Sequence, residues 1–299
     1  MFPFPNLMDE LTQILKDARR IEVRARGMVS NEFSGEYRSS FRGRGIDFHD
    51  LREYTHGDDV RSIDWNTTAR TAEPYVKQFI ERRELNIYIA IDISSSSNYG
   101  SVKFSKRRIA AIISAIFSLS AAKNGDKVGL ILFSDSVEFF SSAKKGSANC
   151  MRILREVLLF PSTNKDSNPG CALEFLLNHQ SRKSLILLAS DFLCSDFEKP
   201  LNISSSKNDI IAIQLVDPAE QELPRVGNVR LSDPETGKTQ IIKTNSEAVR
   251  KTYSKNRNLW QTNLDQIFES NGVDKITLNT NNEPDAALSL RNFFKKRKT

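Results

Sequence analysis

The feature that most constrains the fold is a series of short apolar runs that alternate with helical stretches from residue 85 onward. The runs are rich in β-branched residues and almost wholly apolar, over residues 85–93, 128–133, 184–189 and 210–216. Strands of this kind fit a parallel sheet, because helices cover both of its faces. Helical stretches lie between the runs, at about 104–123, 147–159, 170–179 and 197–204. The alternation predicts an α/β fold with a doubly wound, mostly parallel sheet and right-handed crossovers, as in Rossmann-like proteins.

The end of the chain closes this pattern. A turn at 233–237 joins two polar alternating runs, which predicts an antiparallel hairpin. We expect a helix over about 246–270, a strand near 273–278 and a last helix over about 284–295. The final residues form a short basic tail that we expect to be solvated, Lys295, Lys296, Arg297 and Lys298.

The first 84 residues follow a different pattern. Apolar residues recur at helical spacing over 7–26, with acids early and arginines late, which predicts an amphipathic helix. From 34 to 84 Arg, Asp and Gly dominate, so we expect an irregular region held by salt bridges and side-chain hydrogen bonds. We therefore divide the chain into an N-terminal segment of residues 1–84 and an α/β domain of residues 85–299.

The N-terminal segment contains an acidic cluster, Asp58, Asp59 and Asp64. A metal-dependent hydrolase could use such acids, and this is one open alternative for the function. Three arginines surround the cluster, Arg52, Arg61 and Arg70. Carboxylate–guanidinium pairs that hold the region together are therefore the simpler expectation. We expect Trp65 to anchor the segment in an apolar pocket.

Composition and charge exclude several classes of protein. With 39% hydrophobic and 27% charged residues, the chain is globular and neither disordered nor fibrous. Its 43 basic and 37 acidic residues leave only +6, so we expect no nucleic-acid partner, although a basic adaptor for nucleic acid or an anionic membrane stays open. The longest apolar run, 109–122, is shorter than the ~18–20 residues that span a bilayer.

The chain begins without the features of a signal peptide, and its cysteines show no metal-binding spacing. We expect these cysteines to be reduced thiols, Cys150, Cys171 and Cys194. We therefore expect a cytoplasmic protein that meets a membrane only through a partner.

Polar side chains that suit a metal ion follow the first apolar run. This run ends in Asp92, and Ser94 and Ser96 come two and four positions later. Ligands of open parallel sheets bind beyond the carboxyl ends of the strands, where such a loop turns its oxygens toward one point. Three oxygen ligands suit a hard divalent cation. On their own, two serines in such a loop more often cap the next helix than bind an ion.

Two further segments bring oxygen ligands to the same edge. The run over 184–189 is followed by Ser190 and Asp191, which adds a second carboxylate. The loop before the helical stretch at 170–179 contributes the hydroxyl of Ser167, with Thr163 as a nearby alternative.

This set resembles the metal-ion-dependent adhesion site of von Willebrand factor type A domains. The resemblance implies that the ion ligands are Asp92, Ser94, Ser96, Ser167 and Asp191, and that the ion is Mg²⁺ or Mn²⁺, with Ca²⁺ as a further option. Two positions depart from the pattern. Ser167 stands where the family has Thr, which keeps the hydroxyl, and Ser97 stands where many members have Met.

The N-terminal motifs narrow the resemblance to the bacterial domain of unknown function 58 family. They are Gly43-Arg44-Gly45-Ile46-Asp47-Phe48, Leu51-Arg52-Glu53-Tyr54, the run from Gly57 to Trp65, Ala69-Arg70-Thr71 and Phe192 after Ser190-Asp191. This resemblance implies a type A domain that works with a MoxR-type AAA+ ATPase to assemble or activate another protein complex, a client. It implies no enzymatic activity.

The remaining sequence also predicts a non-enzymatic, protein-binding module. The histidines His49, His56 and His179 lie in different segments, so no Ser–His–Asp or Cys–His arrangement can be built from them. Gly43 and Gly45 lack the downstream Gly-Lys-Ser/Thr of a phosphate-binding loop. Any nucleotide hydrolysis is therefore expected from the partner.

Overall fold

The computed structural model describes residues 7–29, 46–71, 73–81, 84–101, 104–161, 166–194, 196–223, 225–232, 239–281 and 283–297. In chain order the elements, with η for 3₁₀ helices, are α1 (Leu7–Met28), β1 (Ile46–Glu53), η1 (Val60–Ser62), α3 (Trp65–Thr71), β2 (Tyr75–Glu81), β3 (Asn86–Asp92), η2 (Ser95–Asn98), α4 (Lys106–Asn124), β4 (Lys127–Phe133), β5 (Val137–Lys144), α5 (Ser147–Leu159), α6 (Pro169–His179), β6 (Leu185–Ser190), α7 (Glu198–Lys207), β7 (Asp209–Val216), α8 (Pro218–Gln221), β8 (Asn228–Ser232), β9 (Thr239–Lys243), α9 (Glu247–Ser270), β10 (Asp274–Asn279) and α10 (Glu283–Arg297).

The centre of the molecule is a six-stranded sheet in the order β10-β7-β6-β3-β4-β5. Its strands are parallel except β5, which runs antiparallel to β4 at one edge. The predicted neighbours β3 and β6 pair directly, with Ile87 opposite Leu185. The chain winds outward from β3 in one direction and from β6 in the other, which is the doubly wound order with its switch point between these two strands. The predicted fold class is confirmed. Strand β5 was not predicted from the sequence.

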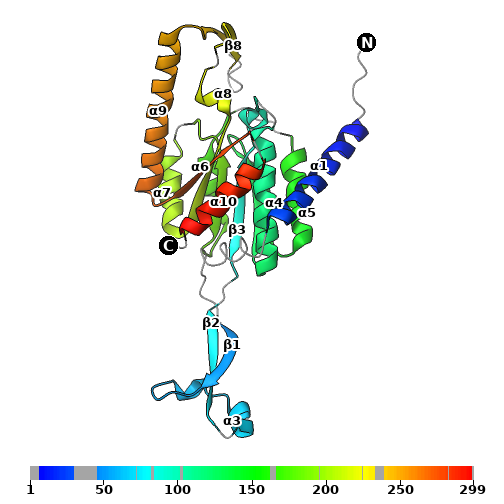
Figure 1. Cartoon of the computed structure of the whole chain (residues 1–299), viewed down its shortest axis with the longest axis vertical. Coiled ribbons are helices and arrows are strands. Elements are labelled where there is room, and N and C mark those ends of the chain that lie inside the picture. The colour runs from blue at the N-terminus through cyan, green and yellow to red at the C-terminus, as the bar shows by residue number, and fades with distance from the viewer. Residues whose placement is uncertain are drawn as a thin grey trace.

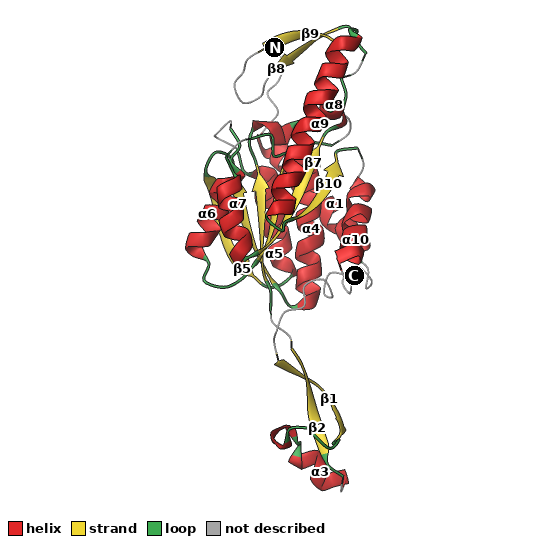
Figure 2. Cartoon of the chain, turned by 90° about the vertical axis from the view of Figure 1, so that its left-hand side faces the viewer, coloured by secondary structure: helices red, strands yellow, loops and turns green. Residues whose placement is uncertain are grey.

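Helices cover both faces of this sheet (Figures 1 and 2). One apolar core joins one set of alternating strand residues to α1, α4, α5 and α10, and a second core joins the other set to α6, α7 and α9. In β3, for example, Ile89 belongs to the first core and Ala90 to the second. Burial on both faces explains why these strands appear in the sequence as continuous apolar runs.

The apolar run at 109–122 forms the middle of α4, a helix whose residues are buried over most of its length. The hydroxyl of Ser105 caps its first turn, and Gly125 ends it in the left-handed conformation at φ 79°. Among the described residues no helix is both long and apolar enough to cross a bilayer.

None of the three cysteines forms a disulfide. Burial raises the pKa of both Cys150 and Cys171 to about 12. Both side chains are therefore thiols at neutral pH, in keeping with the predicted reduced state.

The N-terminal helix belongs to the body of the molecule. The face of α1 that carries Ala18, Ile21 and Ala25 is buried in the first core, where the helix packs against α4 and α5. The ammonium of Lys123 on α4 donates to the carbonyl of Val29 at 2.7 Å, just beyond the helix. The boundary that we placed at residue 84 stays a prediction.

An ordered hairpin stands where the sequence predicted an irregular region. Strands β1 and β2 pair antiparallel from Ile46–Glu81 to Glu53–Tyr75, with η1 and α3 between them. The apolar–polar alternation of β1 is interrupted at His49 and Asp50, where the pairing with β2 shifts register, and this interruption obscured the strand in the sequence. Figure 1 shows the hairpin beyond the end of the sheet where β3 begins, opposite α8 and β8. The Gly43–Gly45 stretch lies outside the described residues.

The acids of this hairpin have structural partners. Arg52 binds the carboxylate of Asp58 through two nitrogens, each at 2.6 Å, as predicted. Asp59 accepts from the backbone of Arg61 at the start of η1, and Asp64 accepts from backbone groups at the start of α3. The prediction for Trp65 was wrong: its side chain is 65% exposed, because α3 lies on the outside of the hairpin.

The C-terminal elements agree with the prediction, although the turn at 233–237 lies outside the described residues. Strands β8 and β9 pair antiparallel, and α9 buries only Leu264 and Phe268, both in its second half. The basic tail is only partly solvated, because Arg297 on α10 pairs with Asp209 at 2.5 Å and Asp274 at 3.0 Å.

Gly129 on β4 tests the close packing of the sheet. A Cβ there would lie 2.5 Å from Cε1 of Tyr88 and 2.8 Å from the carbonyl oxygen of Ser141. We expect Gly129→Ala to lower the free energy of unfolding by about 1–3 kcal/mol, measured by urea titration. The matched control is Gly27→Ala on α1, where a Cβ meets nothing within 4 Å, and it should be neutral or slightly stabilising. Equal stability of the two variants would contradict the close approach.

The Arg52–Asp58 pair predicts a pH dependence. The guanidinium of Arg52, together with the backbone N–H of Thr55, holds the pKa of Asp58 well below its usual range. The stabilisation is therefore complete above the unfolded pKa of about 3.9 and is lost as pH falls through the lower folded pKa. An NMR titration of the Asp58 carboxyl carbon should show this low pKa, and Arg52→Gln should return it toward the ordinary value. The same titration curve in both proteins would refute the assignment.

Candidate metal centre

Asp92 lies at the end of β3 and gathers donors from three loops. Its side chain is 3% exposed. One carboxylate oxygen accepts from the backbone N–H of Ser94 at 2.9 Å. The other accepts from the hydroxyl of Ser167 at 2.5 Å and from the hydroxyl of Ser190 at 2.7 Å. The structure thus brings the predicted residues Ser94 and Ser167 into contact with Asp92. Ser190 also contacts Asp92, although the sequence did not predict it as a ligand.

The register of the sheet explains this convergence. Ile91 of β3 pairs with Ala189 of β6, so the next residues, Asp92 and Ser190, meet at the carboxyl edge. This edge is the switch point of the doubly wound sheet, where the two crossovers diverge and leave room for a ligand. The loop with Ser167 is fixed there because Asn168 donates its backbone N–H to the carbonyl of Ser134 at 2.7 Å. The alternative ligand Thr163 lies outside the described residues.

The two serines of the first motif do not cap a helix. Their hydroxyls lie 3.2 Å apart, and Ser94 makes no side-chain capping bond to η2. The cap of α4 is Ser105 instead. Both hydroxyls are buried, at 0% exposure for Ser94 and 8% for Ser96. The capping interpretation of this motif is therefore wrong, and the hydroxyl pair is left available beside the carboxylate.

Asp191 provides the second carboxylate and is fixed by a sharp turn. One oxygen accepts from the backbone N–H of Leu193 at 3.1 Å, and the residue between them, Phe192, has φ 56°. This left-handed conformation is uncommon for a bulky residue, and burial of the Phe192 ring in the second core maintains it. The backbone therefore sets the direction of the Asp191 side chain.

A lysine that the sequence did not single out lies in this site. Lys106, the first residue of α4, is 1% exposed, and its ammonium donates to Asp191 at 2.8 Å and to Glu220 of α8 at 2.6 Å. In the sequence it is one of three consecutive basic residues at a helix start, which gave no sign that its ammonium turns into the site. Its neighbour Arg107 is buried as well, but donates to the carbonyl of Val157 on α5. Glu220 comes from a segment that carried no motif.

Electrostatics make this a site that attracts cations. Burial raises the pKa of Asp92, and the charge of Asp191 raises it further, while hydrogen bonds from Ser167, Ser94 and Ser190 oppose part of the rise. Burial alone would lower the pKa of Lys106, but Asp191 and Glu220 outweigh it and leave the pKa above its usual value. With all groups ionised, three carboxylates and one ammonium carry a net charge of −2.

The donor set fits a hard divalent cation. All the candidate ligands are carboxylate or hydroxyl oxygens, which Mg²⁺ and Mn²⁺ prefer over nitrogen or sulfur. Within the described residues, no three His, Cys, Asp or Glu side chains converge on one point, so hydroxyls must complete any such site.

A third strand of the sheet, β7, is also followed by a carboxylate, that of Asp217, but its hydrogen bonds give it a structural role. Asp217 follows β7 and forms a capping box with Glu220 at the start of α8. It also accepts from Ser101 and from the hydroxyl of Thr280. Burial raises the pKa of Asp217, and these hydrogen bonds outweigh it, so its pKa lies below the usual value.

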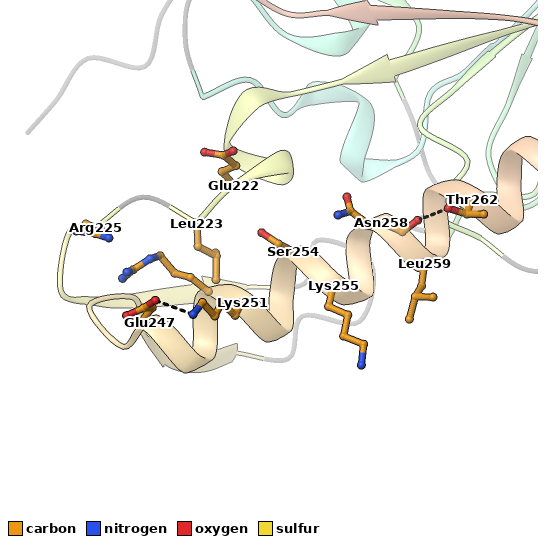
Figure 3. A pocket seen from close by; sticks show the side chains of 11 residues that line it. Glu222, Leu223, Arg225, Glu247, Lys251, Ser254, Lys255, Asn258, Leu259 and Thr262 are labelled. Atoms are coloured by element: carbon orange, nitrogen blue, oxygen red, sulfur yellow. Dashed lines mark hydrogen bonds and ion pairs between the residues drawn. The ribbon is translucent and has the colours of Figure 1, made fainter.

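A groove lies along α9, outside this cluster. It has a volume of about 960 Å³ and runs along the first half of α9, between that helix and the segment after α8 (Figure 3). Its lining mixes cations such as Arg225 and Lys255 with Glu222 and Leu259. We place the candidate site at Asp92, because buried, converging oxygen ligands meet there at the switch point of the sheet.

The family follows from a comparison with known protein families. The family model described as protein of unknown function DUF58 matches residues 50–262. The chain belongs to this family. The DUF58 match spans the hairpin, the candidate site and the first half of α9, so these three parts are features of one family unit. Its α/β domain has the doubly wound, mostly parallel sheet that the sequence predicted.

The chain is also similar to individual proteins. The uncharacterized protein Rv1480 of Mycobacterium tuberculosis is 28% identical over 222 residues, which cover 73% of this DUF58 chain and 70% of the relative. Among solved structures, an aerotolerance-related membrane protein from Bacteroides fragilis is 17% identical with a TM-score of 0.44, covering 71% of this chain and 99% of that one. The VWA domain of SpRpn10 is 11% identical with a TM-score of 0.40, covering 71% and 95%.

Lys106 should be essential to the stability of the site. Lys106→Met leaves Asp191 buried without its cation, and breaking such a pair costs about 3–5 kcal/mol in the free energy of unfolding. Adding Asp191→Asn removes the unpaired charge, so the double variant should be more stable than Lys106→Met alone. Urea titration of the variants measures both effects. A Lys106→Met protein as stable as the wild type would show that the ion pair is unimportant.

Proposed function

We propose that this chain is a metal-dependent protein-interaction module of the cytoplasm. In this proposal Asp92, Ser94, Ser96, Ser167 and Asp191 hold Mg²⁺ or Mn²⁺, with Ca²⁺ as a weaker substitute. The observation that carries the proposal is the pair of buried hydroxyls of Ser94 and Ser96 beside the Asp92 carboxylate. Neither hydroxyl is used to cap a helix. Neither a helix cap nor a hydrolytic mechanism needs this arrangement.

The charges of the ligands explain how such a site would bind a protein. The bound ion would supply a positive centre for a carboxylate from the partner. On this chain, the serine hydroxyls are neutral and the charge of Asp191 is shared with Lys106, so the ligands leave part of the positive charge uncompensated. A Glu or Asp side chain of the partner would complete the coordination, in a bond that strengthens as the interface loses water.

The partner that we propose is a MoxR-type AAA+ ATPase, together with a client protein whose assembly or activation the pair assists. The choice of this partner rests on the resemblance of the N-terminal motifs to the DUF58 family. The hairpin supports a second contact. Trp65 and Val60 are exposed and belong to α3 and η1 of the hairpin, and Figure 1 shows α3 at the opposite end of the molecule from α8. Tryptophan is enriched at the energetic centres of protein interfaces. One chain could therefore hold the ATPase at one end and a client at the other.

The alternatives have weaker support. The hydrolase hypothesis needs the acids Asp58, Asp59 and Asp64 to be available, whereas Arg52 and the starts of two helices engage them. We propose that the chain has no enzymatic activity of its own. A nucleic-acid or membrane adaptor would show binding that weakens steeply with salt, which titration of the chain with DNA or anionic vesicles at several salt concentrations would measure.

Isothermal titration of the purified chain with Mn²⁺ tests the metal site. We expect the wild type to bind and Ser94→Ala/Ser96→Ala to bind at least about tenfold more weakly, because the hydroxyl ligands are gone. Asp92→Ala should abolish binding without changing the far-UV spectrum. The matched control is Ser205→Ala/Ser206→Ala, since these hydroxyls bond only to the backbone of α7. Unchanged binding in both site variants would place the ion elsewhere.

Surface plasmon resonance with the MoxR-type ATPase of the same organism tests the partner. Binding should weaken in EDTA, return with Mg²⁺ or Mn²⁺, and be lost in Ser94→Ala/Ser96→Ala. A complex that survives EDTA and tolerates the double variant would show that the interaction uses another surface. Trp65→Ala in the same assay would then reveal whether that surface is the hairpin.

A further inference from the structure

The buried ammonium of Lys106 lies inside the candidate metal site. It is a cation inside a cluster that is suited to bind another cation, at 2.8 Å from an oxygen of Asp191. Only 1% of its side chain is exposed, so it cannot swing out to solvent without opening the start of α4. Any divalent ion that Asp191 helps to hold must therefore share this carboxylate with Lys106.

Glu220, the second partner of Lys106, connects the site to neighbouring helices. Glu220 accepts from the ammonium at 2.6 Å with one oxygen, and its other oxygen accepts from the backbone N–H of Asp217 at 3.2 Å. Its backbone carbonyl accepts from the hydroxyl of Tyr253 on α9 at 2.8 Å. The side chain of Glu220 is 20% exposed, so it lies at the boundary between the site and the surface. Lys106 thus connects the candidate ligand Asp191 to α8 and α9.

We propose that Lys106 is a tethered competitor of the divalent ion for Asp191, and that Glu220 takes up its ammonium when the ion binds. This inference rests on the proposed function, because it concerns the affinity of the same site. The pair Lys106–Glu220 then sets how much Mg²⁺ or Mn²⁺ the site needs, and α8 senses whether the ion is present.

Charge alone fixes the direction of each effect. Removing the positive charge of Lys106 removes its repulsion of the ion and frees Asp191, so the ion should bind more tightly. Removing the negative charge of Glu220 takes away the second partner of the ammonium and leaves it with Asp191, so the ion should bind more weakly. Because both groups are buried or nearly so, the effects are weakly screened by water, and about tenfold is the expected scale.

Isothermal titration of the full chain with Mn²⁺ tests the competition. We expect Lys106→Gln to bind Mn²⁺ about tenfold more tightly than the wild type, and Glu220→Gln to bind it about three- to tenfold more weakly. The matched control is Lys123→Gln, at the other end of α4, whose ammonium donates to the Val29 carbonyl. It should bind Mn²⁺ as the wild type does. If Lys106→Gln fails to fold, Glu220→Gln still tests the link.

Hydrogen exchange provides a readout that does not depend on affinity. Saturating Mn²⁺ should change the exchange of the backbone amides at 217–221 in the wild type but leave them unchanged in Lys106→Gln. Wild-type affinity in both charge variants would overturn the competition and leave the metal site standing. If the wild type fails to bind Mn²⁺ but Lys106→Gln binds it, Lys106 excludes the ion, so the competition holds and the proposed function falls. If neither protein binds Mn²⁺, both proposals fall.

Discussion

The burial of the Asp92 carboxylate at the switch point of the sheet determines how the residues around it are arranged. Asp92 is held at the end of β3 by hydroxyls from two other loops, and the parallel pairing of β3 with β6 places those loops. A carboxylate at this depth is costly to ionise without compensation. Ser94, Ser167 and Ser190 offset part of this cost by donating hydrogen bonds to Asp92, while the ammonium of Lys106 compensates the neighbouring carboxylate of Asp191. These residues form a compact electrostatic unit at this edge rather than a set of independent ligands.

The two ends of the molecule have different physical characters. The carboxyl edge is buried, charged and rich in oxygen, whereas the hairpin at the amino edge is held by the Arg52–Asp58 pair and presents exposed apolar side chains. Recognition at the first end would depend on ions, and recognition at the second on apolar contact. The rigid, doubly wound sheet between them keeps the two surfaces apart.

Much of the fold could be predicted because burial on both faces leaves continuous apolar runs in the sequence. The strand β5 escaped because an edge strand is covered less, and its mixed pattern lacks such a run. Asp92, Ser94 and Asp191 could be assigned because the ends of parallel strands meet at one edge. Lys106 and Glu220 could not, since a charged residue at a helix start is ordinarily solvated and only the packing of α8 turns these two inward. Trp65 was misjudged for the opposite reason, because an aromatic side chain is ordinarily buried.

The distances along the chain between the parts of the site have a consequence for folding. Ser167 lies 75 residues after Asp92, and Ser190 lies 98 residues after it. Contacts of such long range form only after large loops have closed, which delays them relative to local structure. A nascent or partly folded chain therefore lacks the assembled cluster, even when the first motif has been synthesised. An ion or partner that requires the whole cluster would bind, and stabilise, only the finished domain.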